Sequence, residues 1–113
     1  MKRELRVKKH QEFDRIIRGG KKIKSPHYSI YFELASPDQG FTRIGLAISK
    51  ANGHAVTRVR EKRQVRAMLA KRCEHTLPMN IIIVIRPNIN EKDYHANEAE
   101  LNASLDKLKD LLP

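Results

Sequence analysis

The stretch from residue 55 to residue 66, AVTRVREKRQVR, crowds like charge in a way that limits how this chain can fold. Between positions 58 and 66, the cations are Arg58, Arg60, Lys62, Arg63 and Arg66. A solvated helical face usually pairs its charges at i,i+4 spacing, but Glu61 is the one acid within this stretch. Most of these cations therefore repel one another, and the helix is expected to need an anionic partner.

The whole chain shares this charge imbalance. It has 23 Lys and Arg residues against 13 Asp and Glu residues, which gives a formal net charge of +10. Such an excess favours a polyanionic partner, with nucleic acid first and an anionic membrane surface second, although charge can also serve solubility alone. Residues 88–113 hold more acids than bases, so the first two thirds of the chain are expected to face the polyanion.

Length and apolar content indicate one small domain over residues 1–113. The longest apolar run, 81–85, is far shorter than the about 20 residues that cross a bilayer, so no membrane-spanning segment is expected. The predicted partners are RNA molecules and do not include a membrane. The basic N-terminus leads into no apolar segment of the kind found in secretory signals. Because Cys73 is the only cysteine, no internal disulfide can form, and the reducing cytoplasm is the expected compartment.

The hydrophobic pattern predicts helices at 10–18, 55–75 and 94–112 and strands at 27–35, 41–49 and 81–85. Turn residues at 36–40 predict a hairpin between the first two of these strands, and Gly45 predicts a bulge. The continuous apolar run at 81–85 is typical of a buried central strand. The expected order is α-β-β-β-α-β-α, with one strand not assigned to residues. This order indicates an α+β sandwich with a crossover unit.

Apolar and aromatic side chains predict which faces are buried. A stripe of Val65, Met68, Leu69 and Cys73 and a second of Leu101, Leu105, Leu108 and Leu112 are expected to pack on the core. Strand alternation places Tyr28 and Phe32 on one face, expected in the core, and Tyr31 on the more polar face. Tyr31 is therefore the better candidate to stack on an unpaired base. For Phe13, core and cleft wall are equally consistent with the pattern.

The usual catalytic motifs do not occur in this sequence. None of the five histidines has the spacing of a zinc pair, and a single cysteine cannot build a cysteine-rich zinc site. The chain has no phosphate-binding glycine loop and no GxSxG elbow. The central carboxylates Glu33, Asp38 and Glu61 lie far apart in sequence, unlike those of a two-metal nuclease. We therefore expect no catalytic residue and no metal site in the protein itself.

Three segments together resemble the bacterial ribonuclease P protein component. They are LRVKKHQEFDRIIRGGKKIKSPHYSIYF, RIGLAISKANGHAVTRVREKRQVR and NIIIVIRPN, within a resemblance that covers about residues 5–112. The RxRxKRxxR spacing after a GxAV turn is the most specific part. The chain departs from the family at His54 and Val59, where the family has Asn, and at Ala67, where Glu or Gln is common.

The resemblance implies a fold and a function. The fold would share the topology of a ribosomal protein domain, including a left-handed crossover, whereas the residues alone favour the usual right-handed one. The function would be that of the protein subunit of an endoribonuclease. Its RNA subunit would bind Mg²⁺ and remove the 5′ leader of precursor tRNA. The protein would bind that RNA and the single-stranded leader, with no stable protein partner.

The resemblance also assigns residues to these roles. The five cations of 58–66 and Lys50 are the expected RNA-binding residues, and Phe13, Ile17 and Tyr31 are expected to line the leader cleft. Other classes of function stay open. A ribosomal-type or RNA-chaperone protein would bind RNA equally well with or without a leader, and an autonomous nuclease would cleave without added RNA. A DNA-binding role is weaker, because no helix-turn-helix spacing is found.

Overall fold

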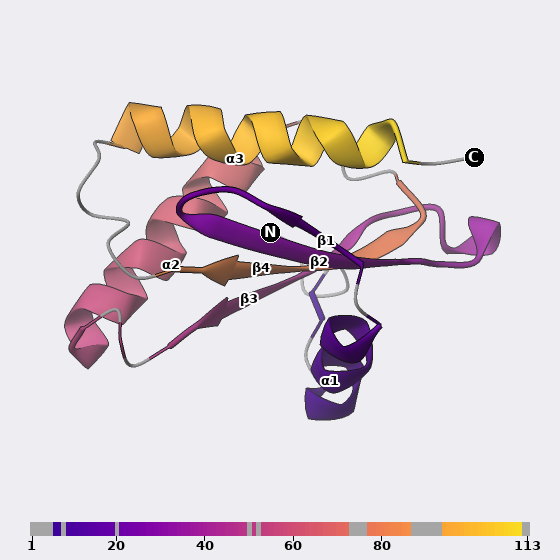
Figure 1. Cartoon of the computed structure of the whole chain (residues 1–113), viewed down its shortest axis with the longest axis horizontal. Helices are drawn as coiled ribbons and strands as arrows, with labels where there is room; N and C mark the ends of the chain where they lie inside the picture. The colour runs from indigo at the N-terminus through magenta and orange to yellow at the C-terminus, as the bar shows by residue number, and fades with distance from the viewer. Residues whose placement is uncertain are drawn as a thin grey trace.

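The computed structural model describes residues 6–7, 9–19, 21–49, 51, 53–72, 77–86 and 94–111. The elements are α1 (His10–Arg18), β1 (Lys22–Lys24), β2 (Tyr28–Leu34), the 3-10 helix η2 (Pro37–Gln39), β3 (Arg43–Ile48), α2 (Ala55–Ala70), β4 (Met79–Ile85) and α3 (Tyr94–Lys109). This confirms the predicted α+β order. The additional strand is β1, which lies before the strand predicted at 27–35 and was not predicted there. In Figure 1, α1 and α3 lie on opposite sides of the sheet.

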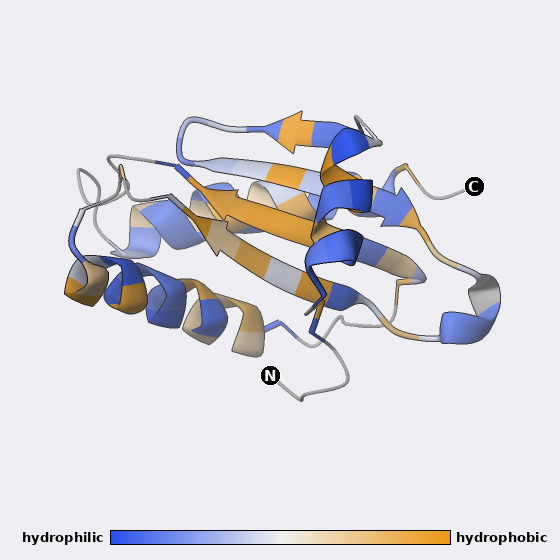
Figure 2. Cartoon of the chain, turned by 90° about the horizontal axis from the view of Figure 1, so that it is seen from below, coloured by the Kyte–Doolittle hydropathy of each residue, from blue (hydrophilic) through white to orange (hydrophobic). Residues whose placement is uncertain are grey.

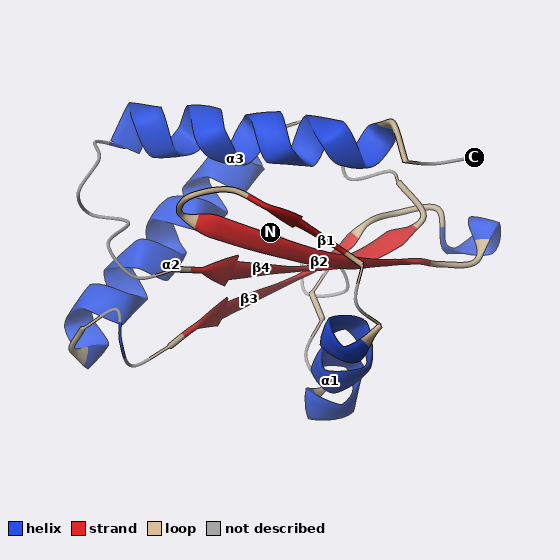
Figure 3. Cartoon of the chain, viewed as in Figure 1, coloured by secondary structure: helices blue, strands red, loops and turns tan. Residues whose placement is uncertain are grey.

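The four strands form one sheet in the order β1-β2-β4-β3. The central strand β4 is antiparallel to β2 and parallel to β3 (Figure 3). The predicted hairpin between 27–35 and 41–49 is therefore wrong. Its strands are separated by β4, whose apolar side chains on both faces suit the middle of a sheet. Because β3 and β4 are parallel, α2 is the crossover between them, and the hand of this crossover stays a prediction.

The larger hydrophobic core lies between the sheet, α2 and α3. It contains Tyr28, Ile30, Phe32, Ile81, Ile83, Ile85, Val65, Met68, Leu69, Leu101, Leu105 and Leu108, among others. These contacts confirm the predicted helical stripes and the core positions of Tyr28 and Phe32, whereas Cys73 and Leu112 lie outside the described residues. Each fully buried Leu or Ile of this kind contributes about 1.5–3 kcal/mol relative to an exposed one. The cationic half of α2 is thus attached to a firmly packed C-terminal half.

A polar cluster fastens α3 to the start of β2. Glu100 Oε1 lies 2.9 Å from His27 Nδ1, and Glu100 Oε2 accepts hydrogen bonds from Ser25 Oγ and from the His27 backbone N–H, both at 2.7 Å. Burial of the Glu100 carboxyl opposes its ionisation, but these hydrogen bonds outweigh the burial and lower its pKa to about 2. The carboxylate is therefore charged at neutral pH and holds the helix in place.

Candidate nucleic-acid interface

The N-terminal half of α2 presents the predicted cations, which we call the cationic face of α2: Arg58, Arg60, Lys62, Arg63 and Arg66. Arg60 and Arg63 are exposed, and the other three are half-buried. Within the described residues, none of the five side chains forms a hydrogen bond or an ion pair, and the buried Nε of Arg58 has no hydrogen-bond partner. The charge on this face is therefore left uncompensated within the described part of the protein.

The one acid in this stretch is turned away from the cationic face. Glu61 is only 2% exposed. Burial, together with the charges of Glu100 and Glu61, raises the pKa of the Tyr28 hydroxyl in the core. The sequence shows Glu61 as the one acid among these cations. Its inward position means that the surface seen by a partner is more positive than the sequence suggests.

Two exposed valines lie at the N-terminal end of α2, beside the cationic face. Val56 is 81% exposed and Val59 is 48% exposed. Together with Ala55, Arg60 and Arg63 they line a shallow hollow on the helix. His54 is the N-cap of α2, but its side chain makes no capping hydrogen bond to the helix. The two positions where the resembled family has Asn, 54 and 59, are therefore both exposed and near one end of the cationic face.

The opposite side of the sheet carries a second, smaller hydrophobic cluster, which we call the α1 face. Val7, Ile16 and Ile82 form its buried centre, and Phe13, Tyr31, Ala47 and Val84 are partly buried against it. Seen from this side in Figure 2, α1 crosses in front of the strands and leaves part of the sheet uncovered by any helix. Phe13 and Tyr31 each keep part of their surface exposed on this face.

The structure thus brings together two of the three predicted cleft residues. Phe13 and Tyr31 both belong to the α1 face, whereas Ile17 is 37% exposed and is not part of the cluster. The predicted bulge at Gly45 is replaced by regular pairing with Ile82 of β4. Gly45 instead allows the close approach of α1, because a Cβ there would lie 2.7 Å from Cζ of Phe13. The sixth predicted RNA-binding residue, Lys50, lies outside the described residues.

Two bidentate ion pairs, which the sequence reasoning missed, hold α1 over the sheet. Arg15 donates to Glu33 of β2 from Nε at 3.0 Å and from Nη2 at 2.7 Å, and Arg43 of β3 donates to Glu12 at 3.2 and 2.9 Å. Asn80 of β4 adds a hydrogen bond of 2.7 Å to Glu33. One signal was available, since Glu12 and Arg15 share one side of α1 at i,i+3 spacing. Their partners, however, are distant in sequence.

These ion pairs also fix the charge of both carboxyl groups. The hydrogen bonds from Arg43 lower the pKa of Glu12. Burial opposes the ionisation of Glu33, but the hydrogen bonds from Arg15 and Asn80 outweigh it, so the pKa of Glu33 is lowered as well. Both arginines are thus engaged with carboxylates of the protein itself, in contrast to the arginines of α2.

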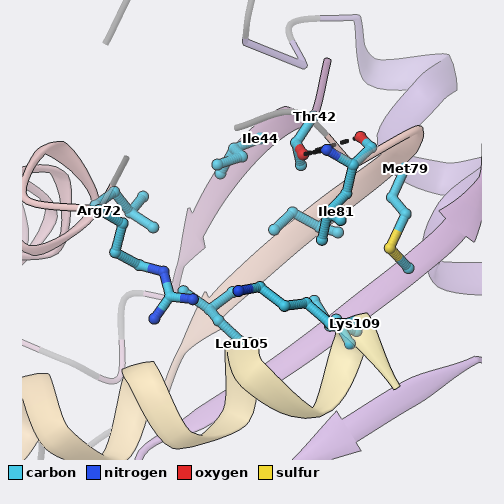
Figure 4. Close-up of a pocket in the computed structure, with 10 residues that line it drawn as sticks. Thr42, Ile44, Arg72, Met79, Ile81, Leu105 and Lys109 are labelled. Atoms are coloured by element: carbon cyan, nitrogen blue, oxygen red, sulfur yellow. Dashed lines mark hydrogen bonds between the residues drawn. The ribbon is translucent and has the colours of Figure 1, made fainter. Parts of the chain in front are cut away.

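A further hollow lies between the sheet and α3, on the side away from α1 (Figure 4). It is lined mainly by apolar side chains such as Ile44, Ile81 and Leu105. Arg72 at its rim donates to Asn102 at 2.9 Å and to Asp106 at 2.8 Å. Because the Arg72 guanidinium already donates to these two side chains, we interpret the hollow as a gap between packed elements and not as a second cationic site. No helix in the described parts of the chain is long and apolar enough to cross a membrane.

The fold and these two surfaces define a small basic α+β protein with a cationic crossover helix on a four-stranded sheet. A family model described as Ribonuclease P matches residues 1–109. The ribonuclease P protein component of Staphylococcus carnosus is 38% identical over 88 residues, which cover 76% of this chain and 74% of that protein. That of Macrococcus caseolyticus is 32% identical over 106 residues, covering 94% and 88%.

Solved structures are similar as well. The structure of the Staphylococcus aureus RNase P protein superposes with a TM-score of 0.82 at 26% identity, covering 93% of this chain and 95% of that one. The RNase P protein from Thermotoga maritima gives a TM-score of 0.75 at 19% identity, covering 87% and 92%, and this likeness concerns the fold alone. The chain belongs to the ribonuclease P protein component family, whose members are subunits of an endoribonuclease complex.

Proposed function

We propose that this protein binds the RNA subunit of ribonuclease P through the cationic face of α2 and the 5′ leader of precursor tRNA through the α1 face. The RNA subunit then holds Mg²⁺ and cleaves the precursor at the mature 5′ end. The protein contributes binding and no catalytic group. We expect no stable protein partner, and we expect the complex to be located in the cytoplasm.

One observation carries this proposal, namely the contrast between paired and unpaired cations. Four cations elsewhere on the described surface do pair with acids of the protein itself: Arg15 with Glu33, Arg43 with Glu12, Lys71 with Glu98 and Arg72 with Asp106. The five cations of α2 have no such partner among the described residues. Adjacent unpaired cations lower the stability of a folded chain unless an anion binds, which supports a polyanionic partner at this face.

Arginine suits the proposed contact with RNA. Four of the five cations are Arg, whose planar guanidinium can donate two parallel hydrogen bonds to one phosphate. Binding several phosphates releases counterions, so affinity should fall with salt by about 0.7–0.9 in log–log slope per contact. Neutralising RNA charge in this way also reduces the Mg²⁺ concentration that the complex needs. Mg²⁺ itself belongs to the RNA subunit in this proposal.

The α1 face suits a single strand because its aromatic rings sit beside an open part of the sheet. Tyr31 and Phe13 are partly buried, which fixes their rings while leaving some surface for contact. Stacking on such rings is worth about 1–3 kcal/mol per base and tolerates any base. Leader binding here favours precursor over product, because the mature tRNA has no leader.

The test is cleavage of precursor tRNA at low Mg²⁺ by a bacterial ribonuclease P RNA, with and without this protein. The proposal expects cleavage only when RNA and protein are both present. Cleavage by the protein alone would identify an autonomous nuclease. RNA binding without rescue, equally strong with and without a leader, would instead identify a ribosomal-type or chaperone protein.

A further inference from the structure

Strand β1 places two more cations on the α1 face. Among the described strands, β1 pairs with β2 alone, antiparallel, with Lys22 opposite Tyr31 and Lys24 opposite Ser29. Paired residues of an antiparallel ladder project to the same side of the sheet, so both lysines share the side of Tyr31. Lys22 Nζ lies 5.8 Å from the centroid of the Tyr31 ring. The aromatic ring proposed to contact the leader therefore has a lysine beside it.

The surroundings of these lysines are cationic. Neither Lys22 nor Lys24 has an acidic partner among the described residues. The charges of Lys22 and Arg86 lower the pKa of Lys24, so three cations gather at this end of the sheet. Arg86 follows β4, and its backbone N–H donates to the carbonyl of His27 at 2.9 Å, next to the turn between β1 and β2.

Another lysine of this chain shows the contrasting arrangement. Lys71 also lies over an aromatic ring, with Nζ 4.9 Å from the centroid of Tyr94, but it pairs with Glu98 at 3.0 Å. The hydrogen bond and charge of Glu98 raise the pKa of Lys71. Lys71 is thus satisfied within the protein, whereas Lys22 and Lys24 repel each other and leave their charge available to an anion.

The contact of α1 with β2 defines the order in which the ring and the lysines follow one another along the strand. α1 is tied to β2 at Glu33, and Tyr31 and then Ser29 follow on the same side of that strand. Moving along β2 away from the α1 contact therefore reaches Tyr31 with Lys22 and next Ser29 with Lys24. Stacking rings followed by a line of cations is the general arrangement of surfaces that bind single-stranded nucleic acid without regard to sequence.

We propose that Lys22 and Lys24 form a second phosphate-binding cluster that contacts the leader backbone beyond Tyr31. This inference rests on the proposed function and adds a path for the distal part of the leader. Lysines on an edge strand can also serve to prevent pairing with other chains. That role depends only on exposed charge at the edge and predicts no dependence on leader length.

The experiment measures the affinity of the reconstituted RNA–protein complex for precursors whose leaders are uridine runs of graded length. The variant is Lys22→Ala with Lys24→Ala. Its matched control is Lys71→Ala with Lys107→Ala, which removes the same charge from the side of α2 and α3. The variant is expected to bind long leaders more weakly, with a salt slope shallower by about 1.4 for two lost contacts. Short leaders and the affinity for the RNA subunit stay unchanged.

Further outcomes separate this inference from the proposed function. Lys22→Arg with Lys24→Arg should restore long-leader binding, because the charge is kept. If the alanine variant behaves as the control does, or also loses affinity for mature tRNA, the leader contact at this cluster is wrong while the proposed function stands. If the wild-type complex binds precursor no better than mature tRNA, the proposed function itself fails.

Discussion

The ring of Phe13 on α1 lies so close over Gly45 of β3 that a Cβ at position 45 would stand 2.7 Å from its Cζ and 3.3 Å from its Cε1. Real Cβ atoms do not approach this closely, so any larger residue must displace the ring or the helix. Val7 closes the other side, with its Cβ 3.2 Å from the same point. The absence of a side chain at position 45 thus sets the height of α1 above the sheet.

Replacing Gly45 with Ala should lower the free energy of unfolding by about 1–3 kcal/mol, because the added methyl overpacks this contact. Urea denaturation measures the loss. Gly19→Ala is the matched control, because a Cβ there meets its nearest atom, the carbonyl oxygen of Ile16, at an ordinary 3.4 Å, and its φ of −62° suits alanine. If both variants have the same stability, the close approach of Phe13 does not constrain α1.

The two ion pairs of α1 should differ in strength because they differ in exposure. Arg43 and Glu12 have side chains 25% and 19% exposed, whereas Arg15 is 59% exposed. Arg43→Ala should therefore cost about 1–3 kcal/mol of unfolding free energy, because it leaves a largely buried carboxylate without its donor. Arg15→Ala should cost less than about 1 kcal/mol, as exposed pairs do. Equal losses in urea denaturation would contradict this ordering.

The Glu100 cluster predicts a loss of stability in acid. The folded state lowers the pKa of Glu100 to about 2 from an ordinary value of 4.5, so its stabilisation is complete above the unfolded pKa and disappears as the pH falls towards 2. The contribution is of the order of 3 kcal/mol at neutral pH. Glu100→Gln should lower stability at pH 7 and flatten the loss between about pH 5 and pH 2.

Asp106 is the comparison for this loss of folding stability at low pH. Its pKa is also lowered, through the hydrogen bond from Arg72, but its side chain is 62% exposed. Solvent screening should make Asp106→Asn a much smaller change in the same pH titration of stability. If Glu100→Gln leaves the acid transition as steep as it is in the wild type, the cluster with Ser25 and His27 does not provide this stability.

Local patterns predicted the helices and most strands, because periodicity reports which side of an element is buried. Strand pairing was not predicted, since the turn at 36–40 is a local signal, whereas the insertion of β4 between β2 and β3 depends on the two apolar faces of a distant segment. β1 escaped notice because three residues, KIK, give too short a pattern and a polar one. Gly45 was read as a bulge because its neighbour Phe13 belongs to another element.

In the candidate site as well, local features could be predicted from the sequence, whereas contacts between distant residues could not. The cations of α2 could be proposed as RNA-binding residues because they are close together in sequence. The structure shows Arg60 and Arg63 exposed, and their role stays a prediction. The ion pairs of α1 join residues separated by 18 and 31 positions, so no spacing rule could show them. The inward position of Glu61 was also hidden, because it depends on how α2 rotates against the core.

The central claim is that the cationic face of α2 binds the RNA subunit. The most direct test measures the affinity of the protein for a bacterial ribonuclease P RNA across a salt series, for the wild type, for Arg60→Ala with Arg63→Ala, and for the Lys71→Ala with Lys107→Ala control. The account predicts that the arginine variant binds more weakly and has a log–log salt slope shallower by about 1.4–1.8, while the control keeps the wild-type slope. An unchanged slope in the arginine variant, or an equal change in the control, would contradict it.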